Sequence, residues 1–235
     1  MTEITESKFK EVISLFEEVE SFRGYVYQLV RKLMNKGCEK EAYTLFLSTW
    51  NFANFRFVMD KFDLEKFMNE MERLEPFFKK FDNKSFDDIN FDSFEEEIKK
   101  IYTTLSKING IKFTGASKIM HLRKPCIFVM WDGYIRREYG IRKKDYKGYI
   151  RFLKKMQNQF RNLSINEKPK RIDEYNYVSI TKLKIIENKI KRTAKRIDKL
   201  ESKIRSKKEN EKLKKLKREL KDLKETKEKI RRAIT

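Results

Sequence analysis

A glycine-containing turn between two predicted helices is the segment of this sequence with the clearest chemistry. Residues 108–119 read INGIKFTGASKI, and an amphipathic helix is expected from about 113 to 122. Gly110 lets the chain turn tightly. The N–H groups that open the next helix lack partners within that helix, so they favour a bound anion such as a phosphate. Because Lys107 and Lys112 flank this position, we expect the turn to bind a nucleic-acid backbone, a contact that reads no sequence.

A dense group of basic residues follows the turn. It is interleaved with Tyr139, Tyr146 and Tyr149 and accompanied by few acids, which favours a surface along a phosphate backbone over a merely solvated face. The residues expected to contact nucleic acid are Lys107, Gly110, Ile111, Lys112, Thr114, Lys118, Arg136, Arg137, Arg142, Lys143, Lys144 and Lys147.

The charge distribution points to the same class of partner. The 235 residues carry a formal net charge of +21, of which residues 1–100 contribute −5, residues 101–180 contribute +12 and residues 181–235 contribute +14. A polyanion would therefore meet the middle and the C-terminal part of the chain. We expect nucleic acid as the partner, duplex DNA before RNA.

Residues 105–140 resemble the helix-hairpin-helix DNA glycosylase superfamily, which includes endonuclease III and the 8-oxoguanine and adenine-mismatch glycosylases. In that family a small residue follows the hairpin, an essential aspartate comes 16 residues later, and an apolar residue stands three further on. Ala116, Asp132 and Ile135 have these intervals. The sequence Asp-Gly-Tyr-Ile at 132–135 is similar to the adenine-mismatch branch.

The resemblance implies an enzyme that flips a nucleotide out of the duplex and removes its base, with Asp132 stabilising positive charge on the sugar or activating water. The sequence departs from the family at Asn109 and Lys112, which replace its hairpin proline and second glycine. Thr114 stands where the strand-cleaving members have a catalytic lysine, and a hydroxyl cannot form a Schiff base. We therefore expect no strand cleavage by that route. Lys118, one turn further on, is either a displaced nucleophile or a plain DNA contact.

Asp132 also has a purely structural interpretation. An aspartate directly before Gly133 is a good helix N-cap, worth about 1 kcal/mol. Two functions consequently stay open, a monofunctional glycosylase that uses Asp132 and a non-catalytic DNA- or RNA-binding protein in which Asp132 is only a cap.

Helices are expected to position these residues. Seven glycines and three prolines offer little turn chemistry for hairpins of strands. Apolar residues at three- and four-residue spacing predict an all-α domain over 1–180, including a helix-hairpin-helix. Its helices should span residues 7–35, 39–59, 63–80, 93–107, 113–122 and 149–164, with a further helix that starts at Gly133 and a loop at 81–92. We assign the aromatic residues between Trp50 and Phe57 to the core.

Residues 181–235 are predicted to form a lysine-rich, coiled-coil-like tail without aromatic residues. The nine-residue step from Ile204 to Leu213 would move the second apolar stripe to the opposite face of a continuous helix. The tail is thus either one long helix with two partners or an antiparallel helical hairpin, which we favour. It could bind nucleic acid, mediate self-association or a protein contact, or keep the protein soluble.

Several classes of protein are excluded by composition. Two distant cysteines, Cys38 and Cys126, and a single histidine provide neither a disulfide framework nor ligand spacing for zinc or iron–sulfur clusters, so no metal or cofactor is expected. No apolar run approaches the roughly 20 residues of a membrane span, and Met1–Ser21 is too charged for a signal peptide. We expect a reducing, cytoplasmic location.

Overall fold

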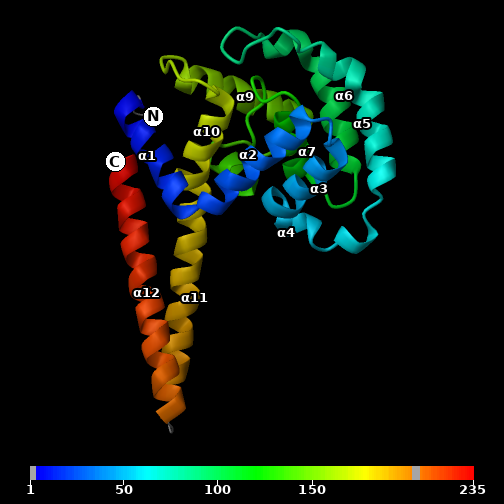
Figure 1. Ribbon diagram of the computed structural model, residues 1–235. Coiled ribbons are helices and arrows are strands. Elements are labelled where there is room, and N and C mark those ends of the chain that lie inside the picture. Colours follow the sequence, from blue (N-terminus) through cyan, green and yellow to red (C-terminus); the bar gives the residue numbers. More distant parts are fainter. Residues whose placement is uncertain (1–3, 203–206) are drawn as a thin grey trace.

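The computed structural model describes residues 4–202 and 207–235, and over these ranges the chain forms helices and loops without any strand. The expected all-α class is therefore confirmed. Helices α1 to α10 build a rounded body, and α11 and α12 extend from it side by side as a long arm (Figure 1). The first half of the body comprises α1 (Glu6–Val19), α2 (Ser21–Asn35), α3 (Glu39–Trp50), α4 (Phe52–Phe55) and α5 (Leu64–Lys79). The second half comprises α6 (Glu95–Lys107), α7 (Lys112–Arg123), α8 (Gly133–Glu138), α9 (Tyr146–Phe160) and α10 (Lys168–Asn176).

The prediction of one helix over residues 7–35 is wrong, because the chain breaks at Glu20 between α1 and α2. Neither glycine nor proline marks the break. The Glu20 carboxylate instead accepts hydrogen bonds from the Tyr177 hydroxyl at 3.1 Å and the Lys182 amine at 2.7 Å. Partners far away in the sequence thus stabilise this break. The predicted helix over 39–59 likewise ends early, at Trp50.

The turn between α6 and α7 has the tight geometry expected from its glycine. Gly110 has a φ of +84°, and a Cβ atom there would lie 2.2 Å from a methyl group of Val58. Lys112, the next residue but one, also lies in the left-handed region, with a φ of +53°. The Asn51 side chain donates hydrogen bonds to the carbonyls of Gly110 at 2.8 Å and Ile111 at 3.3 Å, so the end of α3 supports the turn.

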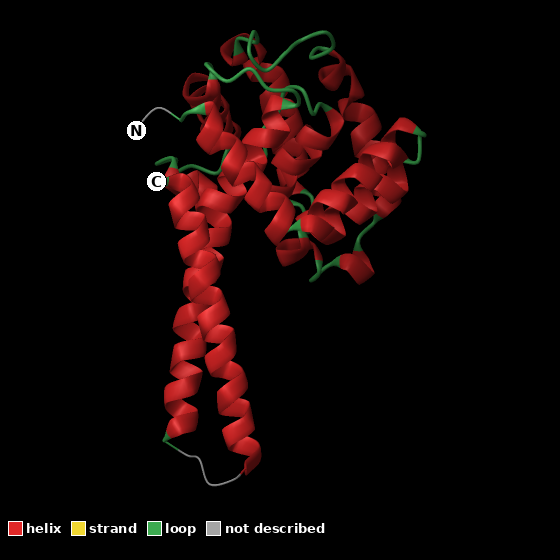
Figure 2. Ribbon diagram, turned by 60° about the vertical axis from the view of Figure 1, so that its left-hand side comes forward, coloured by secondary structure: helices red, strands yellow, loops and turns green. Residues whose placement is uncertain are grey.

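The arm is an antiparallel pair of helices, α11 (Leu183–Glu201) and α12 (Lys207–Ile234), as favoured from the sequence (Figure 2). Ile186, Thr193 and Ile197 of α11 are buried, as are Leu216 and Ile230 of α12. The apolar stripes therefore pack against each other within the chain. Ile204, on which the predicted change of face depends, lies outside the described residues.

The predicted domain boundary at residues 180 and 181 falls inside a continuous helical segment. A short π-helix (Tyr177–Lys182) joins α10 to α11, and the junction residues Tyr177 and Leu183 have right-handed helical dihedral angles. The C-terminal end of α12 returns to α1, where Lys229 forms an ion pair of 2.5 Å with Glu18. The change in composition at residue 181 thus marks a change in helix environment and not a break in the chain.

Candidate functional site

A cavity of about 480 Å³ lies where α4, α7 and α8 meet the beginning of α11. We call it the central cavity. Its walls are aromatic, and five charged side chains reach it. The aromatic residues are Trp50, Phe52, Trp131, Tyr134 and Tyr177, and the charged residues are Arg23, Lys118, Asp132, Arg137 and Asp173.

Asp132 reaches the cavity at the end of a buried, extended segment. Residues 127–131 are at most 1 % exposed. The Tyr149 hydroxyl donates a hydrogen bond of 2.8 Å to the Val129 carbonyl, and the Trp131 indole N–H donates one of 3.3 Å to the Phe113 carbonyl. The hydrophobic core therefore fixes the position at which Asp132 leaves it.

The Asp132 carboxylate has two roles in the structure. Its Oδ1 accepts hydrogen bonds from the backbone N–H groups of Tyr134 at 2.7 Å and Ile135 at 2.9 Å, which confirms the predicted cap of α8. Its Oδ2 accepts a hydrogen bond of 2.7 Å from the Thr181 hydroxyl. The same carboxylate lines the central cavity. Capping and a position beside a ligand are thus compatible.

Lys118 enters the cavity from α7, and its amine donates a hydrogen bond to the Trp50 carbonyl. The pKa of Lys118 is lowered to about 8, mainly because burial disfavours the charged amine and partly because of the positive charge of Arg23. The negative charges of Asp132 and Asp173 act in the opposite direction.

Asp173 is a cavity residue that the sequence did not reveal. It lies on α10 and is 4 % exposed, and its Oδ2 is buried without a hydrogen-bond partner among the residues that the structure describes. Burial raises the pKa of Asp173 to about 7, while the positive charges of Lys170 and Lys118 oppose this shift. A buried carboxyl group that titrates near neutral pH is suited to proton transfer.

The predicted nucleic-acid contacts fall into three groups. Lys107, Lys112, Arg142, Lys143, Lys144 and Lys147 are exposed. Thr114, Lys118 and Arg137 line the central cavity. Gly110, Ile111 and Arg136 are buried.

The prediction that Arg136 lies on the basic surface needs correction. Its guanidinium donates hydrogen bonds inside the protein, to the Ile141 carbonyl and, at 2.6 Å, to the Arg142 carbonyl. Arg136 thus stabilises the loop after α8 because it satisfies two carbonyls there. Arg136 is only 6 % exposed, so its guanidinium is not placed to bind a phosphate at the surface.

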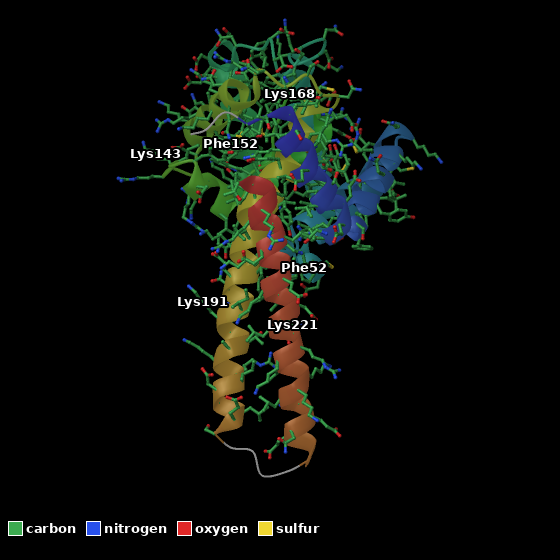
Figure 3. All side chains as sticks on the ribbon, turned by 90° about the vertical axis from the view of Figure 1, so that its left-hand side faces the viewer. Phe52, Lys143, Phe152, Lys168, Lys191 and Lys221 are labelled. Carbon is green, nitrogen blue, oxygen red and sulfur yellow. The ribbon has the colours of Figure 1, made fainter. Side chains whose placement is uncertain are left out.

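The exposed basic loop lies beside the beginning of α7. The carbonyls of Phe113 at 3.3 Å and Lys144 at 3.0 Å share the single hydrogen of the Tyr102 hydroxyl. The Lys144 amine also lies 5.2 Å from the centre of the Phe113 ring. No side chain caps the start of α7, and its first N–H group, that of Lys112, donates a hydrogen bond of 3.4 Å to the Ile108 carbonyl. Lys143 and Lys191 project to one side of the molecule (Figure 3).

The assignment of the aromatic residues near α4 to the core is only partly right. Phe55 is buried, but Phe52 is 48 % exposed and Phe57 is 70 % exposed. The Arg56 guanidinium lies 5.5 Å from the Phe52 ring centre and 4.6 Å from that of Phe57. Because Phe52 also lines the cavity, an exposed aromatic group with a cation stands at its edge. The spacing of the aromatic residues in the sequence does not predict that Phe52 and Phe57 are exposed, because exposed and buried aromatic residues alternate irregularly there.

Comparisons of this chain with protein-family models, curated proteins and solved structures gave no match. In the described part of the chain, none of the helices has the length and apolar character that crossing a bilayer requires.

Proposed function

We propose that this protein binds duplex DNA through the α6–α7 turn, as a helix-hairpin-helix, and removes a base from a nucleotide held in the central cavity. The observation that carries the proposal is the position of Asp132, which lines an aromatic cavity together with Lys118 and Asp173. A volume of about 480 Å³ accommodates a flipped base and its sugar.

DNA binding is supported by the surroundings of the turn. The start of α7 offers N–H groups that no side chain caps, and the exposed Lys107, Lys112 and Lys144 surround it with positive charge. Phe52 and Arg56 stand at the edge of the cavity, where an aromatic side chain can fill the gap that a flipped base leaves in the stack.

The chemistry follows from the three titratable residues. As the bond between the sugar C1′ and the base nitrogen breaks, its electron pair leaves with the base, and the Asp132 carboxylate stabilises the positive charge at C1′. The neutral form of Asp173 gives a proton to the departing base. Water then adds to C1′, and the proton that the water loses returns to Asp173. Lys118 contributes positive charge beside the leaving group, and its amine is already engaged by the Trp50 carbonyl.

Duplexes that contain uracil, 8-oxoguanine, alkylated bases or mismatches, followed by alkali, test the proposal. We expect strand breaks after alkali with at least one substrate, and none without alkali. Asp132→Asn should abolish these breaks while the affinity for duplex DNA stays within twofold. Absence of breaks with every substrate would rule out base removal. Trapping of a covalent adduct with borohydride would instead show that Lys118 is a nucleophile.

A non-catalytic nucleic-acid-binding protein is the second candidate. It is favoured by the fact that both oxygens of Asp132 already accept hydrogen bonds, from Tyr134, Ile135 and Thr181. In that case Asp132→Asn changes nothing in binding or its salt dependence, whereas Gly110→Pro with Lys112→Glu weakens binding to DNA or RNA.

A further inference from the structure

The first turns of α11 are part of the central cavity. The Thr181 hydroxyl binds Asp132 at 2.7 Å, and Ile185 lines the cavity one turn later. The Asn188 amide then donates a hydrogen bond of 3.3 Å to the hydroxyl of Tyr134, another cavity residue. One face of α11 therefore continues directly from the cavity wall.

Further along α11 the same face becomes basic. Steps of three and four residues lead from Ile185 and Asn188 to Arg192, Lys195 and Lys199, which a period of 3.6 residues places on one side of the helix. We call these three residues the α11 stripe. Their side chains are exposed, whereas the contact face toward α12 contains the buried residues Ile186, Thr193 and Ile197.

The α11 stripe carries charge that no acid in the described part of the chain neutralises through an ion pair. Some cations elsewhere on the arm are paired with acids. Lys227 of α12 lies 3.5 Å from Glu187, and Lys217 lies 2.7 Å from Glu201. Among the described residues, Lys214, Arg218 and Arg232 of α12 form no ion pair either. The stripe differs from them because its face of α11 continues from the wall of the central cavity.

We infer that the α11 stripe binds the sugar-phosphate backbone of the DNA segment next to the nucleotide in the central cavity, which rests on the DNA binding proposed above. The arm leaves the body beside the cavity and extends far beyond it (Figure 1). The 14 residue steps from Ile185 to Lys199 span about 21 Å at 1.5 Å per step. This length corresponds to roughly six phosphates of one strand at 3.4 Å each. The contact would add affinity without reading sequence.

Two charge-matched variants of the full-length protein test the inference. The stripe variant is Arg192→Glu, Lys195→Glu and Lys199→Glu. The control is Lys214→Glu, Arg218→Glu and Arg232→Glu, which changes the net charge equally at exposed positions of α12. Helical period places these control positions on the side of α12 away from its buried Leu216 and Ile230. Circular dichroism establishes that both variants fold and melt like the wild type.

Affinity for a 24-base-pair duplex is measured by fluorescence anisotropy between 50 and 200 mM salt. The slope of log K against log salt is negative, and each lost phosphate contact reduces its magnitude by about 0.9. We expect the magnitude of this slope to fall by about 2 to 3 in the stripe variant and by less than 1 in the control. The wild type should also bind the 24-mer more tightly than a 12-mer, and the stripe variant should lose most of that difference.

Each other outcome has a distinct meaning. Equal slopes for the two variants would overturn the inference, because the arm would then attract DNA only through its overall positive charge. DNA binding by the body would still stand. An unchanged slope together with loss of a self-associated species or an acidic protein partner in sedimentation would assign the stripe to protein and overturn it too. If the wild type binds no duplex at 50 mM salt, both the inference and the proposed function fall.

Discussion

Two substitutions of Asp132 should separate its capping role from its charge. Asp132→Ala removes the acceptor for the N–H groups of Tyr134 and Ile135 and for the Thr181 hydroxyl. Loss of an N-cap costs about 1 kcal/mol. Loss of a hydrogen bond to a charged group costs roughly 1.5 to 3 kcal/mol. We therefore expect Asp132→Ala to lower the free energy of unfolding by about 2 to 4 kcal/mol.

Asp132→Asn should behave differently. Its Oδ1 can still accept both hydrogen bonds of the cap, and the Thr181 hydroxyl can rotate to accept from the new amide. The free energy of unfolding should then change by less than about 1 kcal/mol, while the negative charge that balances Lys118 is lost. Because Asp132 raises the pKa of Lys118, that pKa should fall below its value of about 8.

Urea denaturation at pH 7 measures both stabilities, and the pH dependence of amine labelling at Lys118 measures its pKa. Glycosylase activity should fall at least 100-fold in Asp132→Asn, which corresponds to about 2.7 kcal/mol of transition-state stabilisation. Thr181→Val, which removes only the third hydrogen bond, is the control with the charge intact. If Asp132→Ala is as stable as the wild type, the carboxylate does not cap α8 in solution and the reasoning is refuted.

Gly110→Ala should destabilise the protein by about 1 to 3 kcal/mol more than Gly140→Ala, since both have positive φ but only at Gly110 would the new methyl group meet Val58. Equal urea midpoints for these two variants would contradict the close approach. Burial lowers the pKa of His121 to about 3, below its ordinary value of 6.5, so its contribution to stability is complete above pH 6.5 and is lost as the pH falls toward 3. The difference in unfolding free energy between the wild type and His121→Gln should therefore shrink by about 1.4 kcal/mol per pH unit in this window, and a difference independent of pH would disprove a buried neutral imidazole. The raised pKa of Asp173 affects the pH dependence of stability in the opposite direction, because its value of about 7 in the folded protein lies above the ordinary value of 3.8. Asp173→Asn should consequently gain stability relative to the wild type as the pH rises from 4 to 7, and a parallel pair of pH profiles would show that the carboxyl group is not buried.

The sequence predicted the local features of the site more accurately than it predicted which residues make up the site. Asp132 and its cap could be predicted because an N-cap depends on the residues directly around it. The two-helix arm could be predicted because the apolar stripe changes face within a few residues. Asp173 and the break at Glu20 could not, because each depends on partners more than 100 residues away or on burial by other helices. Arg136 was misplaced for a similar reason, since its basic neighbours in the sequence are exposed and it is not.

The helical segment from α10 through α11 connects these features physically. It carries Asp173 in the cavity, then Thr181 on Asp132, and finally the α11 stripe. Thr181 lies in the π-helix, a distortion that occurs often at functional sites. A regular helix from residue 177 would rotate every later side chain relative to the body. The π-helix therefore determines both where Thr181 meets Asp132 and which face of α11 points along the cavity, so the two cannot be adjusted independently.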